Sequence, residues 1–222
     1  MTAASTKQIS AVAAYEVRYS QGGWKYDYRR EHLKLKRVVD SLGLKRGDAV
    51  LEIGCGEGFH SQVLYDLGFR VVGNDLSEVG ISHAESRFPM IRFINRNSIE
   101  LCDILPEEHF DMVLARGHSW YHYELTERNC KGVNVPENTR QMIKLLRPGG
   151  FFVLCIRTDF SGTHYKDGVL NNTYQAYRDL FEPFGEIVLL TDAEGVTLAN
   201  DEDARRSKND IVIATKKPAP VQ

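Results

Sequence analysis

The segment Val50-Leu51-Glu52-Ile53-Gly54-Cys55-Gly56-Glu57-Gly58 decides the fold of this chain. It begins inside the short apolar run 49–53, which is typical of a β-strand buried on both faces. The alternate glycines that follow let the backbone turn tightly out of the strand and approach a ligand closely. The segment therefore predicts a strand that leads, through a ligand-binding turn, into a helix whose free N–H groups face the ligand.

Helical and strand patterns alternate along the rest of the chain. They predict helices over 9–19, 28–42, 58–67, 77–87, 136–146 and 173–181, and strands over 49–53, 69–73, 91–94, 110–115, 151–156, 186–190 and 210–215. Continuous apolar strands separated by helices indicate a parallel sheet covered on both faces. The last two strands lack a crossover helix, so they pair most simply as an antiparallel hairpin, with 201–206 as its solvated tip. We therefore predict a doubly wound, seven-stranded α/β sheet, mostly parallel with an antiparallel last strand.

The length of 222 residues, with 42% hydrophobic and 26% charged residues, favours one globular domain with appendages. We expect an N-terminal arm over 1–27, a main domain over 28–215 and a flexible tail over 216–222. With 28 Lys and Arg against 30 Asp and Glu, the net charge is −2 and argues against nucleic acid or an anionic membrane as a partner.

The four cysteines form no CxxC pair, which favours free thiols in a reducing cytoplasm over a zinc site or a disulfide framework. The N-terminus lacks the apolar core of a signal peptide, and no apolar stretch reaches the ~18 residues of a membrane span. We expect a cytoplasmic protein with no membrane partner and no metal. A homodimer is left open.

Two acids accompany the glycine turn. Glu52 stands two residues before Gly54, and Asp75 ends the next strand. A dinucleotide fingerprint would require glycine at position 59, which is Phe59. A carboxylate at position 52 would repel a pyrophosphate but suits a cofactor with a cationic amine. An acid at the end of the second strand is typical of a group that binds ribose hydroxyls.

Four motifs, in this order, resemble those of class I S-adenosylmethionine-dependent methyltransferases of the small-molecule type. They are Glu52–Gly58, Val72–Ser77, Phe110–Ala115 and Leu145–Gly150. The resemblance covers about residues 28–215, and the terminal hairpin also matches that fold. It implies S-adenosylmethionine as the cofactor and a small molecule as the methyl acceptor.

The resemblance also implies cofactor contacts by position. Asp75 is expected to take the ribose hydroxyls, Leu76 to lie under the adenine, and Asn97 to accept a hydrogen bond from it in place of an aspartate. The complete set is Tyr19, Trp24, Glu52, Gly54, Cys55, Gly56, Gly58, Asp75, Leu76, Asn97, Ser98 and Arg116. Two alternatives stay open: Glu52 orients the loop without touching the cofactor, and the arm aromatics pack on the sheet.

Candidate catalytic residues follow the fourth strand, at the edge of the sheet where the acceptor must lie. His118 is the candidate general base, because a neutral imidazole has a pKa near 7. His122 would share a helix face with it, and Tyr121 would line an acceptor pocket. The alternatives are a capping or packed histidine and aromatic core packing.

Two further base candidates, Asp159 and His164, lie in a polar loop after the fifth strand, for which a solvated loop is the alternative. We expect methyl transfer to oxygen or nitrogen of a sugar, a natural product or an amine. The alternatives are methylation of RNA or a protein side chain, a nucleotide-binding oxidoreductase, and an inactive cofactor-binding subunit.

Overall fold

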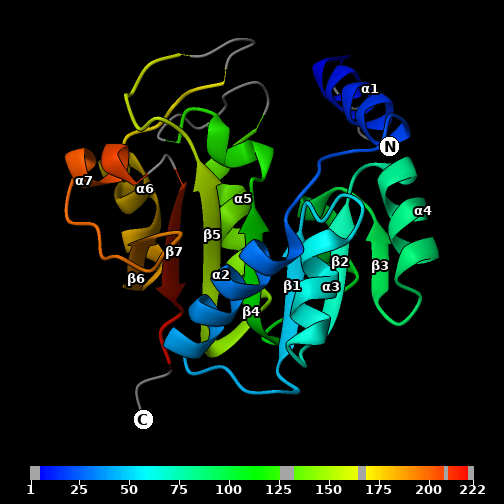
Figure 1. The fold of residues 1–222 in the computed structure, drawn as a ribbon, viewed down its shortest axis with the longest axis horizontal. Helices are drawn as coiled ribbons and strands as arrows, with labels where there is room; N and C mark the ends of the chain where they lie inside the picture. The colour runs from blue at the N-terminus through cyan, green and yellow to red at the C-terminus, as the bar shows by residue number, and fades with distance from the viewer. Residues whose placement is uncertain (1–5, 126–132, 165–168, 208–209, 220–222) are drawn as a thin grey trace.

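The computed structural model describes residues 6–125, 133–164, 169–207 and 210–219, with side chains from residue 12 onward. Seven strands form one sheet in the order β3-β2-β1-β4-β5-β7-β6 (Figure 1). They are β1 Ala49–Ile53, β2 Arg70–Asp75, β3 Arg92–Asn95, β4 Phe110–Arg116, β5 Leu146–Arg157, β6 Glu186–Asp192 and β7 Asp210–Lys216. Strands β1 to β5 pair in parallel, whereas β7 is antiparallel to both β5 and β6. The predicted sheet is confirmed.

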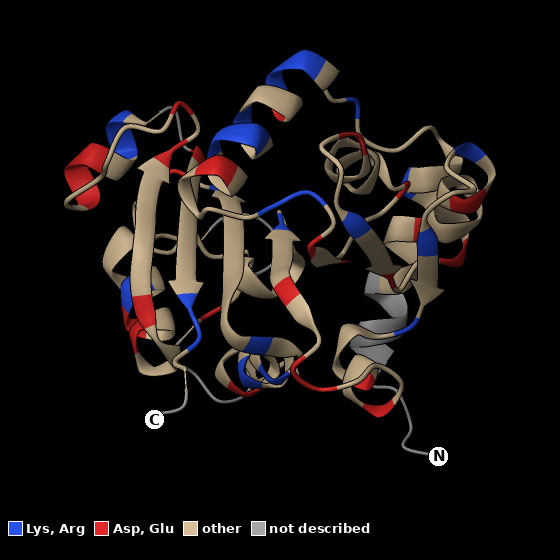
Figure 2. Ribbon diagram, turned by 90° about the horizontal axis from the view of Figure 1, so that it is seen from below, with Lys and Arg blue, Asp and Glu red and all other residues tan. Residues whose placement is uncertain are grey.

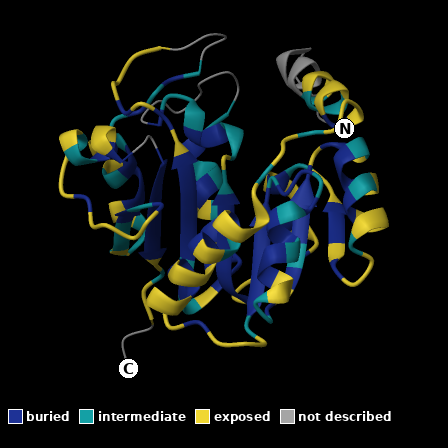
Figure 3. Ribbon diagram, viewed as in Figure 1, coloured by how far each residue is buried: buried dark blue, intermediate teal, exposed yellow. Residues whose placement is uncertain are grey.

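Helices cover both faces of the sheet. They are α1 Thr6–Ser20, α2 Tyr28–Ser41, α3 Phe59–Asp66, α4 Glu78–Arg87, α5 Val135–Lys144, α6 Tyr174–Phe181 and α7 Asp201–Arg206, with 3-10 turns η1 Ser98–Asp103, η2 Ser119–His122 and η4 Glu182–Phe184. Helices α2, α3 and α4 pack on one face, and α5, α6 and α7 on the other. Figure 3 shows the result: the strands are buried and the outer helix surfaces are exposed.

The two faces of β1 explain why its apolar run is continuous. Leu51 and Ile53 belong to the core beneath α5 and α6, whereas Val50 belongs to the core beneath α2, α3 and α4. Successive residues of a strand point to opposite faces, so both faces need apolar side chains. Charged residues of both signs are interspersed over the helices and loops in Figure 2.

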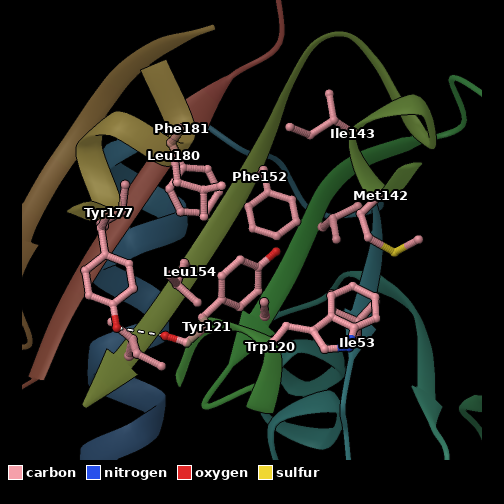
Figure 4. Close-up of a cluster of buried hydrophobic side chains, with 14 of the residues drawn as sticks. Ile53, Trp120, Tyr121, Met142, Ile143, Phe152, Leu154, Tyr177, Leu180 and Phe181 are labelled. Carbon is pink, nitrogen blue, oxygen red and sulfur yellow. Dashed lines mark hydrogen bonds between the residues drawn. The ribbon is translucent and has the colours of Figure 1, made fainter. Parts of the chain in front are cut away.

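Tyr121 lies in the first of these cores and does not line an acceptor pocket. Its ring stacks on Phe181 with centroids 5.9 Å apart, and it has no exposed surface. Its Oη lies 3.1 Å from Thr139 Oγ1, and Tyr177 Oη donates a hydrogen bond of 2.9 Å to its carbonyl oxygen (Figure 4). The buried phenol is therefore satisfied inside the protein, as core packing requires.

Two predicted boundaries were wrong. Helix α5 ends at Lys144 and β5 begins at Leu146, ahead of the Pro-Gly-Gly stretch that we expected to separate them. This stretch pairs near the beginning of β5, where Gly149 donates a backbone hydrogen bond to Lys217 and Gly150 accepts one from it. The stretch 201–206 is no solvated tip, because it forms α7, whose Ala204 is fully buried.

A carboxylate of α1 binds the first turn of α4. Glu16 Oε1 accepts a hydrogen bond of 2.8 Å from the Glu78 N–H, and Oε2 accepts one of 3.1 Å from the Val79 N–H. The first N–H groups of a helix have no partner within it, so an acid placed there stabilises the contact. The chain then turns through Gly22 and Gly23, both with positive φ, toward α2.

Candidate active site

One cavity of about 1040 Å³ lies at the carboxyl ends of the parallel strands. Below, "the cavity" means this space. It reaches from Asp75 at the end of β2, past β4, to Arg157 at the end of β5. The residues that line it include Tyr19, Trp24, Lys25, Asp27, Arg30, Glu31, Gly54, Asp75, Leu76, Asn97, Ser98, Arg116, Gly117, His118, Trp120, His122, Tyr123, Arg157 and Asp210. Parallel strands thus bring together residues that are far apart in the sequence.

The glycine turn is closely packed on both sides. Gly54 has a φ of 71°, and a Cβ there would come within 2.8 Å of His118 Cδ2. Gly56 has a φ of 54°, and a Cβ there would come within 2.5 Å of Tyr19 Oη. Both positions need glycine for the backbone conformation and for the space. Gly54 lines the cavity and also a smaller space of about 100 Å³, which Cys55 and Gly56 border without lining the cavity.

Asp75 connects the glycine turn to the start of α4. Its Oδ2 accepts a hydrogen bond of 2.8 Å from the Gly56 N–H, and its Oδ1 accepts one of 2.8 Å from the Ser77 N–H. Burial raises the pKa of this carboxyl, and the backbone N–H groups oppose the rise. The carboxylate lines the cavity and has lone pairs beyond those two bonds, so it can accept further hydrogen bonds from a ligand.

The neighbouring residues extend this end of the cavity. Leu76 is 38% exposed and lines the cavity, where it offers an apolar surface for a flat ring. Asn97 caps η1, with its Oδ1 3.4 Å from the Ile99 N–H, and Ser98 Oγ donates a hydrogen bond of 2.7 Å to Asn74 Oδ1. All three predicted residues line the cavity, although the Asn97 oxygen is directed at the backbone.

The N-terminal arm places aromatic rings over the glycine turn. Tyr19 is buried, and Trp24 meets it edge-on at a centroid distance of 5.4 Å. Arg18 lies over the Trp24 ring at 5.0 Å. Both predicted aromatics line the cavity, so the arm packs on the ligand side of the sheet.

Glu52 does not line the cavity. Its carboxylate accepts a hydrogen bond of 2.5 Å from Ser61 Oγ on α3 and lies 3.8 Å from His60 Nδ1. Burial raises its pKa to about 7, and the Ser61 hydrogen bond limits the rise. This arrangement matches the alternative in which the acid orients the loop without facing the ligand.

A charged network continues from this point to the cavity wall. His60 Nε2 lies 3.2 Å from Glu31 Oε2, and Glu31 Oε1 lies 3.3 Å from the Arg116 guanidinium. Burial favours the protonated form of Glu31, but the hydrogen bond from His60 and the charge of Arg116 lower its pKa to about 2. Arg116 also lies over the Tyr26 ring at 5.2 Å.

His118 lines the cavity beside the glycine turn, as its position after β4 predicts. It caps η2, with its Nδ1 3.4 Å from the Trp120 N–H. Burial, with a further contribution from His122, lowers its pKa to about 3. The pKa of this ring is therefore lower than that of a free imidazole, because the surroundings remove the hydration of the charged ring.

The other predicted catalytic residues are dispersed. His122 lines the cavity, but it ends a 3-10 turn that His118 precedes, so the two do not share a face of an α-helix. Asp159 and His164 are exposed and do not line the cavity. The Asp159 carboxylate accepts hydrogen bonds from the Ser161 N–H and the Asn171 amide, which is the arrangement of an ordered surface loop.

Residues 50–150 match the profile of a family described as "Methyltransferase domain". A protein of Mycolicibacterium smegmatis named "Probable S-adenosylmethionine-dependent methyltransferase" is 27% identical over 149 residues, which are 66% of this chain and 51% of that protein. A ubiquinone biosynthesis O-methyltransferase of Bradyrhizobium diazoefficiens is 32% identical over 122 residues, 54% of this chain and 44% of that protein. The chain belongs to the class I S-adenosylmethionine-dependent methyltransferases.

The solved structures agree with this methyltransferase fold. The N-methyltransferase NodS from Bradyrhizobium japonicum WM9, in complex with S-adenosyl-L-homocysteine, superposes with a TM-score of 0.66 and 17% identity, covering 93% of this chain and 98% of that one. The chain spans about half the length of the curated relatives named above. S-adenosylmethionine is the methyl donor of the family.

The residues of this methyltransferase fit that donor. Asp75 and Leu76 offer a carboxylate and an apolar surface at one end of the cavity, and Gly54 keeps the adjoining wall free of side chain. Arg116 and His122 also line the cavity, and the buried atoms Arg116 Nε and His122 Nδ1 have no hydrogen-bond partner among the described residues.

Several other predictions concern the whole chain. In the part that the structure describes, no helix is both long and apolar enough to cross a membrane, and no group of three or more His, Cys, Asp or Glu is placed to hold a metal ion. Cys55, Cys102 and Cys155 are free, and Cys130 lies outside the described residues. The sequence analysis missed Arg30 and Asp210, because only the folded topology brings these two charges to the cavity.

Proposed function

We propose that this chain transfers the methyl group of S-adenosylmethionine to an oxygen or nitrogen atom of a small molecule. The observation that carries the proposal is the single cavity of about 1040 Å³ that extends from Asp75 to Arg157. Ligand pockets usually measure ~300–1,000 Å³, so this volume suits a nucleoside cofactor together with a compact acceptor. The names of the relatives support both kinds of acceptor atom, since one is an O-methyltransferase and one an N-methyltransferase.

When bound, the sulfonium of the cofactor supplies an electrophilic methyl group. The protein has to hold the acceptor in line with that methyl, and positioning of this kind lowers the barrier by several kcal/mol. Asp75 and Leu76 bind the nucleoside at one end of the cavity. Trp120 and Tyr123 border the acceptor, and the arm residues Tyr19 and Trp24 exclude water from the space between the two ends.

His118 acts as a hydrogen-bond donor toward this space. A ring nitrogen that accepts a hydrogen bond carries no proton, so the contact of Nδ1 with the Trp120 N–H places the proton of the neutral ring on Nε2. The lowered pKa keeps the ring neutral across the physiological range. In this form the Nε2–H group can donate a hydrogen bond that orients the acceptor, but Nε2 cannot take up the acceptor's proton.

Two measurements test the proposed function. Addition of S-adenosylhomocysteine should raise the Tm of the protein while NAD leaves it unchanged, because only a ligand of the native state stabilises it by mass action. Transfer of a labelled methyl group should then be followed across a panel of hydroxyl and amine acceptors. Stabilisation by NAD alone would favour the oxidoreductase alternative.

The two remaining alternatives, a macromolecular acceptor and an inactive cofactor-binding subunit, each predict a different experimental result. Labelled RNA or protein recovered from a cell extract, with no labelled small molecule, would favour the macromolecular acceptor. For RNA, the binding would also weaken steeply with salt. Firm binding of S-adenosylhomocysteine without any product, in extract or panel, would favour an inactive cofactor-binding subunit.

A further inference from the structure

Among the charged side chains that line the cavity, the acids have partners within the described part of the protein, whereas several cations have no acidic partner there. Its acids all have partners within the described residues: Asp27 with the Arg30 N–H, Glu31 with Arg116, Asp75 with the Gly56 and Ser77 N–H groups, and Asp210 with Lys34. The lining cations that have no acidic partner in the described ranges are Lys25, Arg30 and Arg157. The cavity lining holds as many acids as cations, but the charged groups of Lys25, Arg30 and Arg157 form no ion pair among the described residues.

Arg30 and Arg157 belong to one wall. Arg157 pairs in register with Asp210 across β5 and β7, so their side chains share a face of the sheet. Asp210 binds Lys34 of α2 at 2.7 Å, which fixes this face as the one that α2 covers. Arg30 precedes Lys34 by one helical turn, on the same side of α2. The Lys34–Asp210 pair is buried, whereas the two arginines are exposed.

This wall lies at the opposite end of the cavity from Asp75, the carboxylate that we expect to bind the ribose hydroxyls. Asp75 ends β2, whereas Arg157 ends β5, and the sheet order places β1 and β4 between them. At the usual strand spacing, β5 is about 14 Å from β2 and about 10 Å from the glycine turn after β1. Arg116 ends β4 on this path, and its Nε has no acceptor among the described residues. Guanidinium groups thus line the path from the glycine turn to the far wall.

We propose that the methyl acceptor carries an oxyanion, a carboxylate or a phosphate, which Arg30 and Arg157 bind at the far end of the cavity. This inference rests on the proposed function and specifies its substrate class. Arginine binds both groups through paired N–H donors, which fix orientation as well as affinity. An anchored oxyanion would hold the nucleophilic atom of the acceptor in the middle of the cavity, beside Gly54 and His118.

The test uses the full chain saturated with S-adenosylhomocysteine. Calorimetry would measure the binding of benzoate and phenyl phosphate, with benzamide and benzyl alcohol as uncharged counterparts. We expect the anions to bind and the neutral compounds not to bind. Arg157→Ala and Arg30→Ala should each weaken anion binding about tenfold or more, the effect of losing a charge-assisted contact. Arg29→Ala, on the same helix but outside the cavity lining, should change nothing.

Each other outcome overturns the inference. It fails if the anions do not bind at millimolar concentration, or if Arg157→Ala and Arg30→Ala bind them as the unmodified chain does. It also fails if these variants lose affinity for S-adenosylhomocysteine to the same extent, because the arginines would then hold the cofactor carboxylate. A preference for benzoate or for phenyl phosphate separates the two oxyanions.

The same experiment separates this inference from the proposed function. If S-adenosylhomocysteine itself does not bind the folded chain, the methyltransferase proposal fails before the anions are added. If it binds and the anions do not, only the acceptor class is wrong. Arg157→Lys serves as a second variant that keeps the charge and loses the paired donors, and we expect it to bind the anions with intermediate affinity.

Discussion

The phenol of Tyr19 lies against Gly56, so closely that a Cβ on residue 56 would be 2.5 Å from Tyr19 Oη. The contact joins the N-terminal arm to the turn that follows β1. The Asp75 carboxylate accepts a hydrogen bond from the N–H of the same glycine. The turn is therefore held between an aromatic ring and a carboxylate, and its shape depends on both.

Gly56→Ala should destabilise the fold by two separable effects. The left-handed conformation costs a residue with a Cβ ~1–2 kcal/mol, and displacement of the Tyr19 ring adds ~1–2 kcal/mol. In a Tyr19→Ala background only the first cost should remain. Urea unfolding of the four proteins measures the coupling. Gly43→Ala is the control, since Gly43 has a φ of 69° and nothing within 4 Å of its Cβ position. Equal losses in both backgrounds would show that the ring does not constrain the turn.

Glu16→Ala should release the arm from α4. Loss of a helix cap of this kind costs ~0.5–2 kcal/mol, which acts on the arm and not on the sheet. We expect faster tryptic cleavage after Arg18 and weaker binding of S-adenosylhomocysteine, with little change in Tm. Glu78→Ala is the matched control, because Glu78 contributes only its N–H to this contact. Unchanged cleavage would mean that the carboxylate does not hold the arm.

Asp75→Asn should weaken S-adenosylhomocysteine binding by ~1.5–3 kcal/mol, about 10- to 100-fold in Kd. The amide carries no charge. Its NH2 group would also face the backbone N–H of Gly56 or Ser77, so that two hydrogen-bond donors would oppose each other. Calorimetry measures the affinity, and urea unfolding measures the accompanying loss of stability. Asp40→Asn, on the exposed surface of α2, should change neither. A normal Kd would exclude Asp75 from the cofactor site.

The buried Glu52 carboxyl should make the protein less stable as the pH rises from about 4.5 to 7. Its pKa is raised from 4.5 to about 7, so in this window the unfolded chain has released a proton that the folded chain keeps. The free energy of unfolding should fall by up to ~3 kcal/mol and then level off. Glu52→Gln should remove this slope in urea titrations at several pH values. Parallel curves for the two proteins would contradict the raised pKa.

The Glu31 carboxyl should make the protein less stable as the pH falls, the opposite of the effect of Glu52. Its effect lies at lower pH, so the contributions of the two carboxyls to the free energy of unfolding can be measured separately. Its pKa is lowered to about 2, so the stability it contributes is present above 4.5 and lost as the pH falls toward 2. Glu31→Gln should therefore flatten only the acid end of the curve.

The sequence predicted the sheet because β1 and its neighbours are apolar on both faces, and it predicted the cavity end that holds Asp75 because strand ends converge there. It did not distinguish Trp120 from Tyr121, since a 3-10 turn sends adjacent side chains in different directions and only one of them faces the cavity. It also missed the Arg157–Asp210 pairing, which depends on antiparallel register between distant strands.

His118→Gln should separate a hydrogen-bond donor from a base. The Gln amide nitrogen takes the place of Nε2–H but cannot accept a proton, so a donor role predicts activity within about tenfold of the unmodified enzyme. His118→Ala lacks the donor and should lower turnover by about 10²-fold or more while S-adenosylhomocysteine affinity stays nearly constant. Because the pKa of His118 is lowered to about 3, the rate should show no step near pH 6.5 from this residue. If Gln is as inactive as Ala and the unmodified enzyme has such a step, His118 is a base.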